Sequence, residues 1–313
     1  MSDSLLNRIR SVQTSGVGAN KGARSNSSLR DLKKNIKISS QEIELLSKYI
    51  YSISGIYIES SKAYLLETRL GKLLEIEKCH SYAELYYKSK ADKSKSIEGK
   101  IIDAITTNET LFFRDNSPFE LLKFKILPEV LDRRLGDSHA DRSTPLRIWS
   151  AACSTGQEVY SVAMVIKELL GDTGNINLQL MGTDLSDAAI KQASYGSYNK
   201  FEIERGLARE RLQRFFLENG SHWKIRDEIR SMISFKKFNL MGPFTNLGKF
   251  SIIFCRNVAI YFTREDRKKL FEKLADCLEP NGFLILGSTE SLTGICPRFI
   301  PKRHLKSIFY QLK

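Results

Sequence analysis

Residues 146–170 read LRIWSAACSTGQEVYSVAMVIKELL and indicate the class of fold. The first six residues are mostly apolar and predict a short buried strand over 146–151. Apolar side chains at helical spacing predict a helix over 157–170, and Gly171 is a suitable stop. The residues between them are small, so the backbone can approach a ligand closely beside the free N–H groups of the helix N-terminus. The run predicts a strand, a ligand-binding turn and a helix in succession.

Strands alternate with helices in the residues that follow. We expect further strands over 178–183, 233–238, 250–255 and 282–287. Thr263 is placed to cap a helix through Leu278, and Pro280-Asn281-Gly282 should end it. This alternation indicates a parallel sheet covered on both faces.

The C-terminal residues depart from the alternation. Residues 297–302 and 307–312 are strand-like and are joined too tightly for a crossover helix. We therefore expect an antiparallel hairpin at the edge of the sheet. An α/β sheet with such a terminal pair is the outline of the nucleotide-binding methyltransferase fold.

Residues 195–232 do not fit the strand–helix pattern and are interpreted as an insertion. They contain a charged helix over 208–216, a turn at Asn219-Gly220, and a hairpin-like pair around Trp223 and Met232. These features give the insertion a character of its own, distinct from the strand–helix alternation around it.

The N-terminal part reads as helical. Ser39 and Glu42 form a capping box that opens a helix, and a second helix follows Ser60-Ser61. Two further helical stretches run through 81–89 and 96–106. Residues 1–36 are rich in Ser, Gly, Asn and Arg, which predicts a disordered tail.

Length and composition exclude several classes of protein. A chain of 313 residues allows about two domains and is long enough to bury a full core. Its 42% apolar, 27% charged and 10% aromatic residues are ordinary for a globular protein. The longest apolar runs, 162–166 and 258–262, are far short of a membrane span. A wholly disordered chain, collagen, a coiled coil and an integral membrane protein are excluded.

Cysteine and histidine usage argues against a disulfide framework and against a metal site. The five cysteines are scattered and include no C-x-x-C, and the four histidines are not spaced as pairs of ligands. The first residues, MSDSLL, carry an early acid and no apolar stretch, so we do not expect a signal peptide. The expected location is the cytoplasm.

The net charge of +13 favours an acidic partner. Residues 1–37 contribute +6 of it, from eight basic and two acidic side chains. Nucleic acid, an anionic membrane surface, an acidic protein, or simply a soluble surface with excess lysine would all be compatible with this charge.

Two acidic residues lie where the predicted sheet would bind a ligand. Asp184 follows the second strand, at the carboxyl edge where open α/β sheets hold their ligands, and is placed to accept both hydroxyls of a ribose. Glu158 lies in the first turn of the first helix and is placed to accept an ammonium group. Because only Gly156 is present and G-x-G-x-x-G is absent, a pyrophosphate-containing dinucleotide is disfavoured. Together these residues suit S-adenosylmethionine. A capping role for Asp184 and helix-dipole stabilisation by Glu158 are the alternatives.

Three longer blocks carry a resemblance to a known family. They are TNETLFFR (107–114), IWSAACSTGQE (148–158) and CRNVAIYF (255–262). In this order they resemble the chemotaxis receptor glutamate methyltransferases, the CheR family, over roughly residues 38–313. Two positions depart from the family pattern, which commonly has a second acid at Gln157 and a proline at Val159. The resemblance implies a class I, Rossmann-like S-adenosylmethionine-dependent methyltransferase sheet, preceded by a small all-α domain and carrying a small antiparallel β insertion.

The resemblance also implies a role for each matched residue. Arg114 and Tyr261 are implied as catalytic residues. The implied cofactor-binding residues are Asn108, Thr110, Arg114, Glu158, Asp184, Asn239, Leu240, Arg256 and Asn257, with Asn239 and Leu240 at the adenine. No metal is implied. S-adenosyl-L-methionine would be the methyl donor and S-adenosyl-L-homocysteine the product.

The implied reaction forms glutamyl methyl esters on chemotaxis receptors, in bacterial adaptation. A glutamate has an ordinary pKa of about 4.3 and is already ionised at neutral pH, so no general base is needed. Arg114 can hold the carboxylate through its guanidinium fork and Tyr261 can donate a second hydrogen bond. A salt bridge for Arg114 and packing for Tyr261 are the structural alternatives.

Two other functions remain as alternatives. A nucleic-acid methyltransferase would suit the charge, but Asn257 is followed by Val258-Ala259 rather than Pro-Pro-aromatic, and Cys255 follows Phe254 rather than proline. A non-catalytic cofactor-sensing module would be expected to lose Arg114 or Tyr261, and both are present.

The expected organisation is a disordered basic tail (1–36), a helical receptor-docking domain (37–106) and a methyltransferase domain (107–313) with a β insertion at about 195–238. The expected partners are the cytoplasmic methylation helices of the receptors, with Lys62, Arg69 and Lys72 as the basic complement. The turn after Phe216 is short, so we expect no strong tether to a receptor C-terminal peptide. We expect a monomer that binds no nucleic acid.

Overall fold

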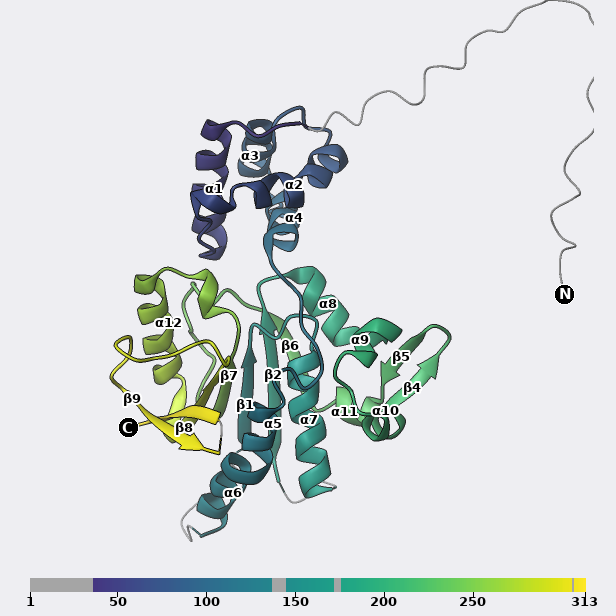
Figure 1. Cartoon of the computed structure of the whole chain (residues 1–313), viewed down its shortest axis with the longest axis vertical. Helices are drawn as coiled ribbons and strands as arrows, with labels where there is room; N and C mark the ends of the chain where they lie inside the picture. The colour runs from purple at the N-terminus through teal and green to yellow at the C-terminus, as the bar shows by residue number, and fades with distance from the viewer. Residues whose placement is uncertain (1–35, 137–144, 172–175, 306) are drawn as a thin grey trace, which may run out of the picture. The chain divides into compact units, whose positions relative to one another are not determined.

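The computed structural model describes residues 36–136, 145–171, 176–305 and 307–313 (Figure 1). Its centre is a seven-stranded sheet in the order β6-β2-β1-β7-β8-β10-β9. The five parallel strands are β1 (Leu146–Ala151), β2 (Leu178–Asp184), β6 (Ile233–Lys237), β7 (Phe250–Cys255) and β8 (Leu278–Leu286). The terminal strands β9 (Phe299–His304) and β10 (Ser307–Leu312) pair antiparallel at one edge. The parallel sheet and its terminal hairpin are confirmed.

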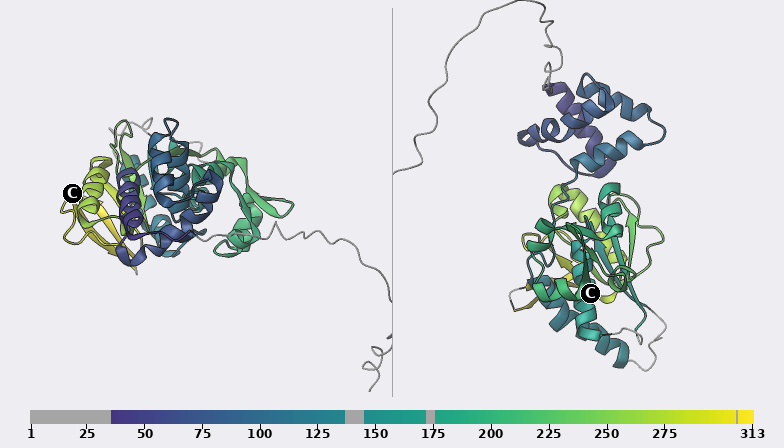
Figure 2. Two further views of the ribbon diagram at one scale, coloured as in Figure 1. Left: turned by 90° about the horizontal axis from the view of Figure 1, so that it is seen from above. Right: turned by 90° about the vertical axis from the view of Figure 1, so that its right-hand side faces the viewer.

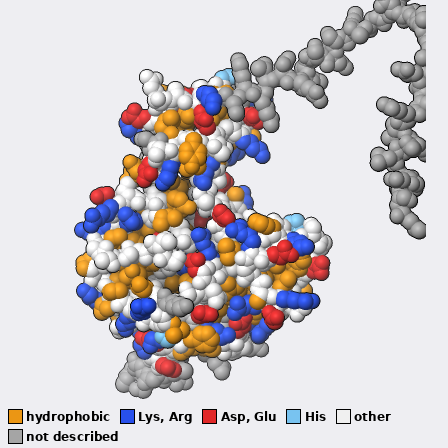
Figure 3. All heavy atoms as spheres, viewed as in Figure 1, with side chains coloured by type: hydrophobic (Ala, Val, Ile, Leu, Met, Phe, Trp, Pro, Cys, Tyr) orange, Lys and Arg blue, Asp and Glu red, His pale blue; other side chains and the backbone are white. Residues whose placement is uncertain are grey.

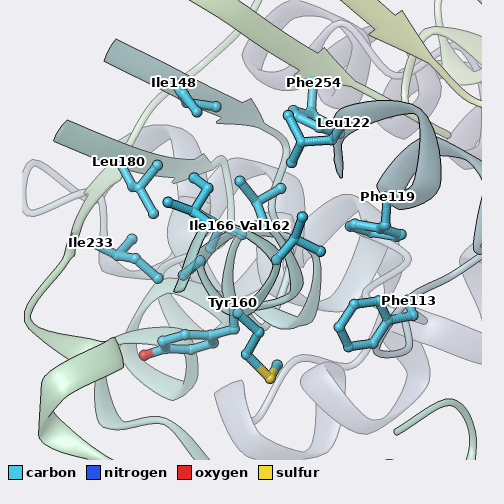
Figure 4. Packing of buried hydrophobic residues seen from close by; sticks show 14 of the residues in the cluster. Phe113, Phe119, Leu122, Ile148, Tyr160, Val162, Ile166, Leu180, Ile233 and Phe254 are labelled. Atoms are coloured by element: carbon cyan, nitrogen blue, oxygen red, sulfur yellow. The ribbon is translucent and has the colours of Figure 1, made fainter. Parts of the chain in front are cut away.

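Alternate residues of the central strands enter two separate hydrophobic cores. In β1, Ile148 belongs to the core formed with α7 (Gln157–Leu170), whereas Trp149 belongs to the core formed with α12 (Arg264–Asp276). Figure 4 shows the first of these cores, in which Ile148 and Leu180 face Val162 and Ile166 of the helix. Because side chains alternate across a strand, helices on both faces follow from the sequence pattern.

The turn between β1 and α7 requires its glycine. Gly156 caps the helix with a φ of 98°, a conformation that other residues rarely adopt. A Cβ atom at this position would lie 3.0 Å from the Cβ of Ala193 and 3.1 Å from the Tyr198 hydroxyl. The same hydroxyl donates a 2.8 Å hydrogen bond to the Thr155 carbonyl, so the turn is held tightly.

The N-terminal helices form a bundle with its own core. They are α1 (Ser40–Ser54), α2 (Tyr64–Glu77), α3 (Tyr82–Ala91) and α4 (Ser96–Ile105), with a short 3₁₀ turn at Ser60–Lys62. Figure 2 shows the four helices side by side from two further directions. The capping box of Ser39 and Glu42 is present, and Leu66, Leu70, Leu73 and Leu74 are buried in the bundle core. The helical N-terminal part of the fold is confirmed.

A second, three-stranded antiparallel sheet has the order β3-β5-β4. It consists of β3 (Ser197–Asn199), β4 (Phe216–Asn219) and β5 (His222–Ile225), and the helices α9 (Lys200–Glu204), α10 (Arg209–Phe215) and α11 (Asp227–Arg230) accompany it. The predicted pairing around Trp223 and Met232 is wrong, because Trp223 pairs with Tyr198 and Glu218 instead. Residues 233–237, which the expected boundary of the insertion includes, belong to the large sheet.

Several element boundaries differ from those expected. The helix after Thr263 ends at Asp276, and β8 begins at Leu278, before Pro280, because Phe250 pairs with Leu278. Phe216 begins β4 instead of ending a helix. Three helical segments precede β1 and were not predicted: α5 (Ser117–Leu121), a π-helical turn (Leu122–Ile126) and α6 (Leu127–Gly136). The predicted disordered tail, residues 1–36, lies outside the described residues except for Ile36.

All five cysteines are buried and unpaired. Across the described ranges, no helix combines the length and the apolar character needed to cross a membrane. The same residues contain no cluster of three or more His, Cys, Asp or Glu side chains that could hold a metal ion.

Candidate active site

A pocket opens at the carboxyl ends of β1, β2 and β7. Its wall consists of residues 106–110, 152–154 and 256–258, together with Arg114, Glu158, Asp184 and Tyr261. Seven of the nine residues predicted to bind the cofactor, and both predicted catalytic residues, therefore lie around one pocket. This is the edge at which open α/β sheets bind their ligands.

Glu158 is held by two neighbours within this pocket. Its Oε1 accepts a 2.7 Å hydrogen bond from the Ser150 hydroxyl, and its Oε2 accepts a 2.9 Å bond from Nη1 of Arg256. Its side chain is only 12% exposed. The carboxylate is thus fixed in one orientation, and each oxygen retains an acceptor site for a ligand.

Arg256, at the end of β7, is buried and connects both sides of the pocket. Its Nη2 donates to Oδ2 of Asp115 at 2.8 Å and to the Arg114 carbonyl at 2.9 Å. Its Nε is buried and has no partner among the described residues. An unpaired buried donor costs free energy, and no hydrogen bond from the described residues offsets that cost at this atom.

Asp184 ends β2 and is also buried. One of its oxygens accepts the Ser154 N–H at 2.8 Å, and the other accepts the Ser186 N–H at 2.9 Å. Burial raises the pKa of this carboxyl above the ordinary 3.8, although the backbone hydrogen bonds act in the opposite direction. Each oxygen keeps a second acceptor site, as recognition of two adjacent hydroxyls requires.

The segment 108–116 crosses the pocket in a strained conformation. Phe113, Asp115 and Asn116 have positive φ angles of 52°, 66° and 41°, which non-glycine residues seldom adopt. The Phe113 N–H is held by the Ser161 hydroxyl at 3.0 Å. Such strain persists only where the surroundings impose it, and it is common in functional sites. The segment places the half-buried Arg114 in the pocket wall, where its Nη1 donates to the Glu109 carbonyl at 3.3 Å.

Asn108 and Thr110 lie in the pocket wall on the same segment. The Asn108 carbonyl accepts a 2.9 Å hydrogen bond from the Ser154 hydroxyl. Ser154 also binds Asp184 through its N–H, so one residue connects the segment to the predicted ribose acceptor.

Tyr261 lies at the end of a 3₁₀ turn, Ala259–Tyr261, on the opposite wall. Its carbonyl accepts a 3.0 Å hydrogen bond from the Tyr57 N–H of the helical bundle. Within the described ranges, its hydroxyl makes no hydrogen bond and is free to donate one to a ligand.

Asn239 and Leu240 are not among the residues that line this pocket. The Asn239 amide donates a 3.0 Å hydrogen bond to the Ile53 carbonyl at the end of α1, and its oxygen accepts the Met241 N–H at 2.9 Å. Leu240 is 6% exposed and packs in the core with α12. Neither side chain lines this pocket, and their place at the adenine stays a prediction.

The two departures from the family pattern lie outside the pocket wall. Gln157 is buried and its Oε1 accepts a 2.8 Å hydrogen bond from the Thr155 hydroxyl. Val159 is buried in the core under the sheet. Neither change alters the arrangement of Glu158.

Three residues of the site were not found by sequence reasoning: Ser150, Asp115 and Glu290. Ser150 and Asp115 bind Glu158 and Arg256, and no spacing in the sequence indicates these contacts. Glu290 binds the backbone of residues 257–259. A signal for Glu290 was available, because it follows a predicted strand at the ligand-binding edge, as Asp184 does.

A larger cavity, of about 760 Å³, lies elsewhere, between α12 and β9. Its floor is mainly apolar, with Arg264, Glu265 and Lys268 among its lining residues. It contains none of the strand-end residues described above, so the chemistry is assigned to the pocket at the ends of β1, β2 and β7.

Two family models match the chain. One, described as the all-alpha domain of CheR methyltransferase, matches residues 41–106, and the other, described as its SAM binding domain, matches residues 108–304. The chain is also 38% identical over 276 residues to the chemotaxis protein methyltransferase Cher2 of Pseudomonas putida, which covers 87% of this chain and 98% of that protein. It is 38% identical over 277 residues to chemotaxis protein methyltransferase 1 of Pseudomonas aeruginosa, covering 87% and 98% of the two chains.

Proposed function

Because this chain belongs to the CheR family of chemotaxis protein methyltransferases, we propose that it methylates glutamate side chains of chemotaxis receptors. The methyl donor would be S-adenosyl-L-methionine, and the products a glutamyl methyl ester and S-adenosyl-L-homocysteine. The reaction would take place in the cytoplasm and serve adaptation in chemotaxis.

The observation that carries the proposal is the arrangement of Asp184, Glu158 and Arg256 around one pocket. Two carboxylates with spare acceptor sites suit the ribose hydroxyls and the ammonium group of S-adenosylmethionine. The unpaired Nε of the buried Arg256 suits its carboxylate. When bound, this cofactor supplies an electrophilic methyl group on a sulfonium. No metal is required for such a transfer.

Asn108, Thr110, Arg114 and Asn257 would complete the binding site around the methionyl end. Asn239 and Leu240 would contribute to the adenine end through the position of their loop rather than through the side-chain contacts of the present conformation. This loop is well anchored, because the Lys273 ammonium donates to the carbonyls of Leu240 at 2.6 Å and Gly242 at 2.9 Å.

The substrate carboxylate would be held by Arg114 and Tyr261. A glutamate is ionised at neutral pH, so the enzyme needs to orient it and exclude water but does not need a general base. This agrees with a pocket wall that includes no histidine among the described residues. Arg114 offers a planar pair of donors and Tyr261 an unengaged hydroxyl, which together fix one carboxylate oxygen in line with the methyl group.

The motifs disfavour a nucleic-acid substrate, and the face of the molecule seen in Figure 3 offers no continuous basic track for one. In Figure 3, lysine and arginine side chains are scattered over the visible face among acidic ones and do not gather in one patch. Nucleic-acid binding requires basic side chains clustered along the phosphate backbone. Membership of the family favours the methylation helices of chemotaxis receptors as the partner instead. The enzyme would act on them as a monomer.

The proposal is tested by transfer of labelled methyl from S-adenosylmethionine to receptor-containing membranes, followed by mild alkali. We expect alkali-labile label, released as methanol, because a carboxyl ester hydrolyses under these conditions. Membranes whose carboxylates have been blocked with a carbodiimide and an amine are the control and should accept no label. Alkali-stable label, or label on added nucleic acid alone, would contradict the proposal.

A further inference from the structure

Glu290 binds four backbone N–H groups with one carboxylate. Its Oε2 accepts from Asn257 at 2.6 Å and from Gly287 at 2.9 Å. Its Oε1 accepts from Val258 at 3.2 Å and from Ala259 at 3.0 Å. Among the residues the structure describes, no lysine or arginine forms an ion pair with it. Its charge is therefore balanced by peptide dipoles alone.

Three of these donors are consecutive, which is an unusual arrangement for a loop. Asn257 has a φ of 57°, and this left-handed residue turns the N–H groups of 257–259 towards one point. Successive N–H groups directed to one point form a concavity that binds anions. In this chain the concavity is filled by the protein's own carboxylate.

Gly287 makes this close approach possible. A Cβ atom there would lie 2.6 Å from Oε2 of Glu290 and 2.8 Å from Nδ2 of Asn257. The end of β8, the Glu290 carboxylate and the loop after β7 are thus packed without space for a methyl group. Any side chain at 287 would displace the carboxylate from the four donors.

The loop that Glu290 holds is part of the pocket wall. Asn257, Val258 and Tyr261 line the pocket, whereas Glu290 does not. The 3₁₀ turn that carries Tyr261 begins at Ala259, and the Tyr261 N–H donates to the Val258 carbonyl at 3.1 Å. The backbone that Glu290 fixes therefore determines the position of the turn that carries the Tyr261 side chain.

We propose that Glu290 is a positioning residue for methyl transfer, which fixes the backbone of residues 257–259 and thereby holds Tyr261 at the substrate carboxylate. This inference rests on the role of Tyr261 in the proposed function. Glu290 contacts neither cofactor nor substrate and acts only through the loop.

The first test needs no substrate. In Glu290→Gln, one carboxylate oxygen is replaced by an amide NH₂, which cannot accept a hydrogen bond and faces two N–H donors. Amide hydrogen exchange of the ligand-free protein should accelerate at least about ten-fold at residues 257–259, where protection depends on these bonds. The matched control is Glu279→Gln, which removes a part-buried carboxylate bonded to Ser251 and Arg134 at the start of β8, the strand that precedes Glu290. It should leave exchange at 257–259 unchanged.

The second test is a double-mutant cycle with Tyr261→Phe. Glu290→Gln alone should lower the rate of methyl transfer at saturating substrates at least about ten-fold. If Glu290 acts through Tyr261, the Glu290→Gln substitution should cause little further loss of transfer rate in a protein that already carries Tyr261→Phe. Additive losses, or a wild-type transfer rate in folded Glu290→Gln, would overturn the proposal. A merely structural role would lower the melting temperature without producing this non-additivity.

A second variant covers the case in which Glu290→Gln does not fold. Gly287→Ala displaces the carboxylate sterically while keeping its charge, and it should reproduce both the exchange and the rate effects. Wild-type exchange at 257–259 in this variant would overturn the proposal. If the wild-type enzyme does not esterify glutamates at all, the proposed function fails, but the exchange experiment still decides whether Glu290 holds the loop.

Discussion

The Tyr51 hydroxyl donates a 2.6 Å hydrogen bond to Oδ2 of Asp266, across 215 positions of sequence. Tyr51 lies in α1 of the helical bundle, and Asp266 lies in the first turn of α12, where the Thr263 hydroxyl also donates to it at 2.8 Å. Two further bonds link the end of α1 to the other part of the chain: Tyr57 N–H to the Tyr261 carbonyl, and the Asn239 amide to the Ile53 carbonyl. Of these three bonds, the one to Tyr261 attaches the helical bundle to the pocket wall.

Replacing Tyr51 by phenylalanine should lower the free energy of unfolding by about 1 kcal/mol at neutral pH, because the Asp266 carboxylate loses a donor. Burial raises the pKa of Asp266, but the hydrogen bonds from Tyr51 and Thr263 outweigh it and leave this pKa below the ordinary 3.8. A depressed pKa stabilises the fold above the ordinary value, and this contribution is lost as the pH falls through the folded-state pKa. Urea unfolding at about pH 7 and about pH 3 measures this effect. The difference in unfolding free energy between the variant and the wild type should be smaller at about pH 3 than at about pH 7.

Tyr87→Phe is the control for that measurement, because Tyr87 is 64% exposed and its loss should change the unfolding free energy at neither pH. If Tyr51→Phe lowers the unfolding free energy by the same amount at both pH values, the contribution of the Tyr51–Asp266 hydrogen bond does not depend on ionised Asp266.

Asp184→Ala should weaken binding of S-adenosylhomocysteine by about 1–3 kcal/mol, since buried ribose hydroxyls would lose a charged acceptor. Because burial raises the pKa of Asp184, affinity should fall on acidification at a higher pH than an ordinary aspartate would give. The stability of the ligand-free protein should change with pH in the opposite direction to the ligand affinity. A carboxyl whose pKa is raised on folding destabilises the fold when it is ionised, so Asp184 favours folding at low pH. Calorimetry measures the affinity, and Asp187→Ala, on the exposed Asp187–Lys237 pair, should leave it unchanged.

Arg114→Lys keeps the charge but loses the planar pair of donors, so turnover should fall much more than cofactor affinity. Arg205→Lys is a matched control on the same side of the protein, because Arg205 pairs with the Glu109 side chain at 2.8 Å but does not line the pocket. Single-turnover transfer at saturating cofactor separates the two effects. If affinity collapses while the single-turnover rate is retained, Arg114 binds the cofactor and has no part in catalysis.

The sequence was informative wherever burial follows from a local pattern. The apolar run in residues 146–151 and the helical spacing in 157–170 were sufficient because each predicts an element that buries its apolar side chains in the core. The pocket could be anticipated because the ends of parallel strands meet at one edge, which brings Glu158, Asp184 and Asn257 together from distant segments.

The errors occur where a distant partner overrides the local signal. Pro280 suggests the end of a helix, but pairing with Phe250 draws Leu278 into β8. A distant partner also holds the Asn239 side chain, because its amide donates to the Ile53 carbonyl, 186 positions away; its place at the adenine stays a prediction. Arg256 was predicted to bind the cofactor, but no spacing in the sequence indicates that it also binds Glu158 and Asp115.

The structure changes which basic residues should be tested for receptor docking. Arg69 is not free, because its guanidinium donates to the Ile105 carbonyl and, at 2.8 Å, to the Thr107 hydroxyl. Reversing its charge would disturb the segment that leads into the pocket. Lys62 and Lys72 are exposed, so the double reversal Lys62→Glu and Lys72→Glu should slow association with receptors and flatten its salt dependence. Unchanged association at low ionic strength would exclude these two lysines, at the turn before α2 and on α2, as part of the docking surface.

The last prediction concerns the small sheet as a site for a receptor C-terminal peptide. The hairpin of β4 and β5 is closed by only Gly220 and Ser221, with Gly220 at a φ of 61°. Because β5 is central, β4 offers a free edge, but it is only four residues long. An added strand gains affinity from main-chain hydrogen bonds and from pockets for alternate side chains. So short an edge offers few of these bonds, and the tight turn leaves no loop to cover an incoming strand. We therefore expect peptides from the host's receptor C-termini to bind more weakly than micromolar in calorimetric titration. Micromolar binding that protects the amides of residues 216–219 from hydrogen exchange would contradict this and identify β4 as the docking edge.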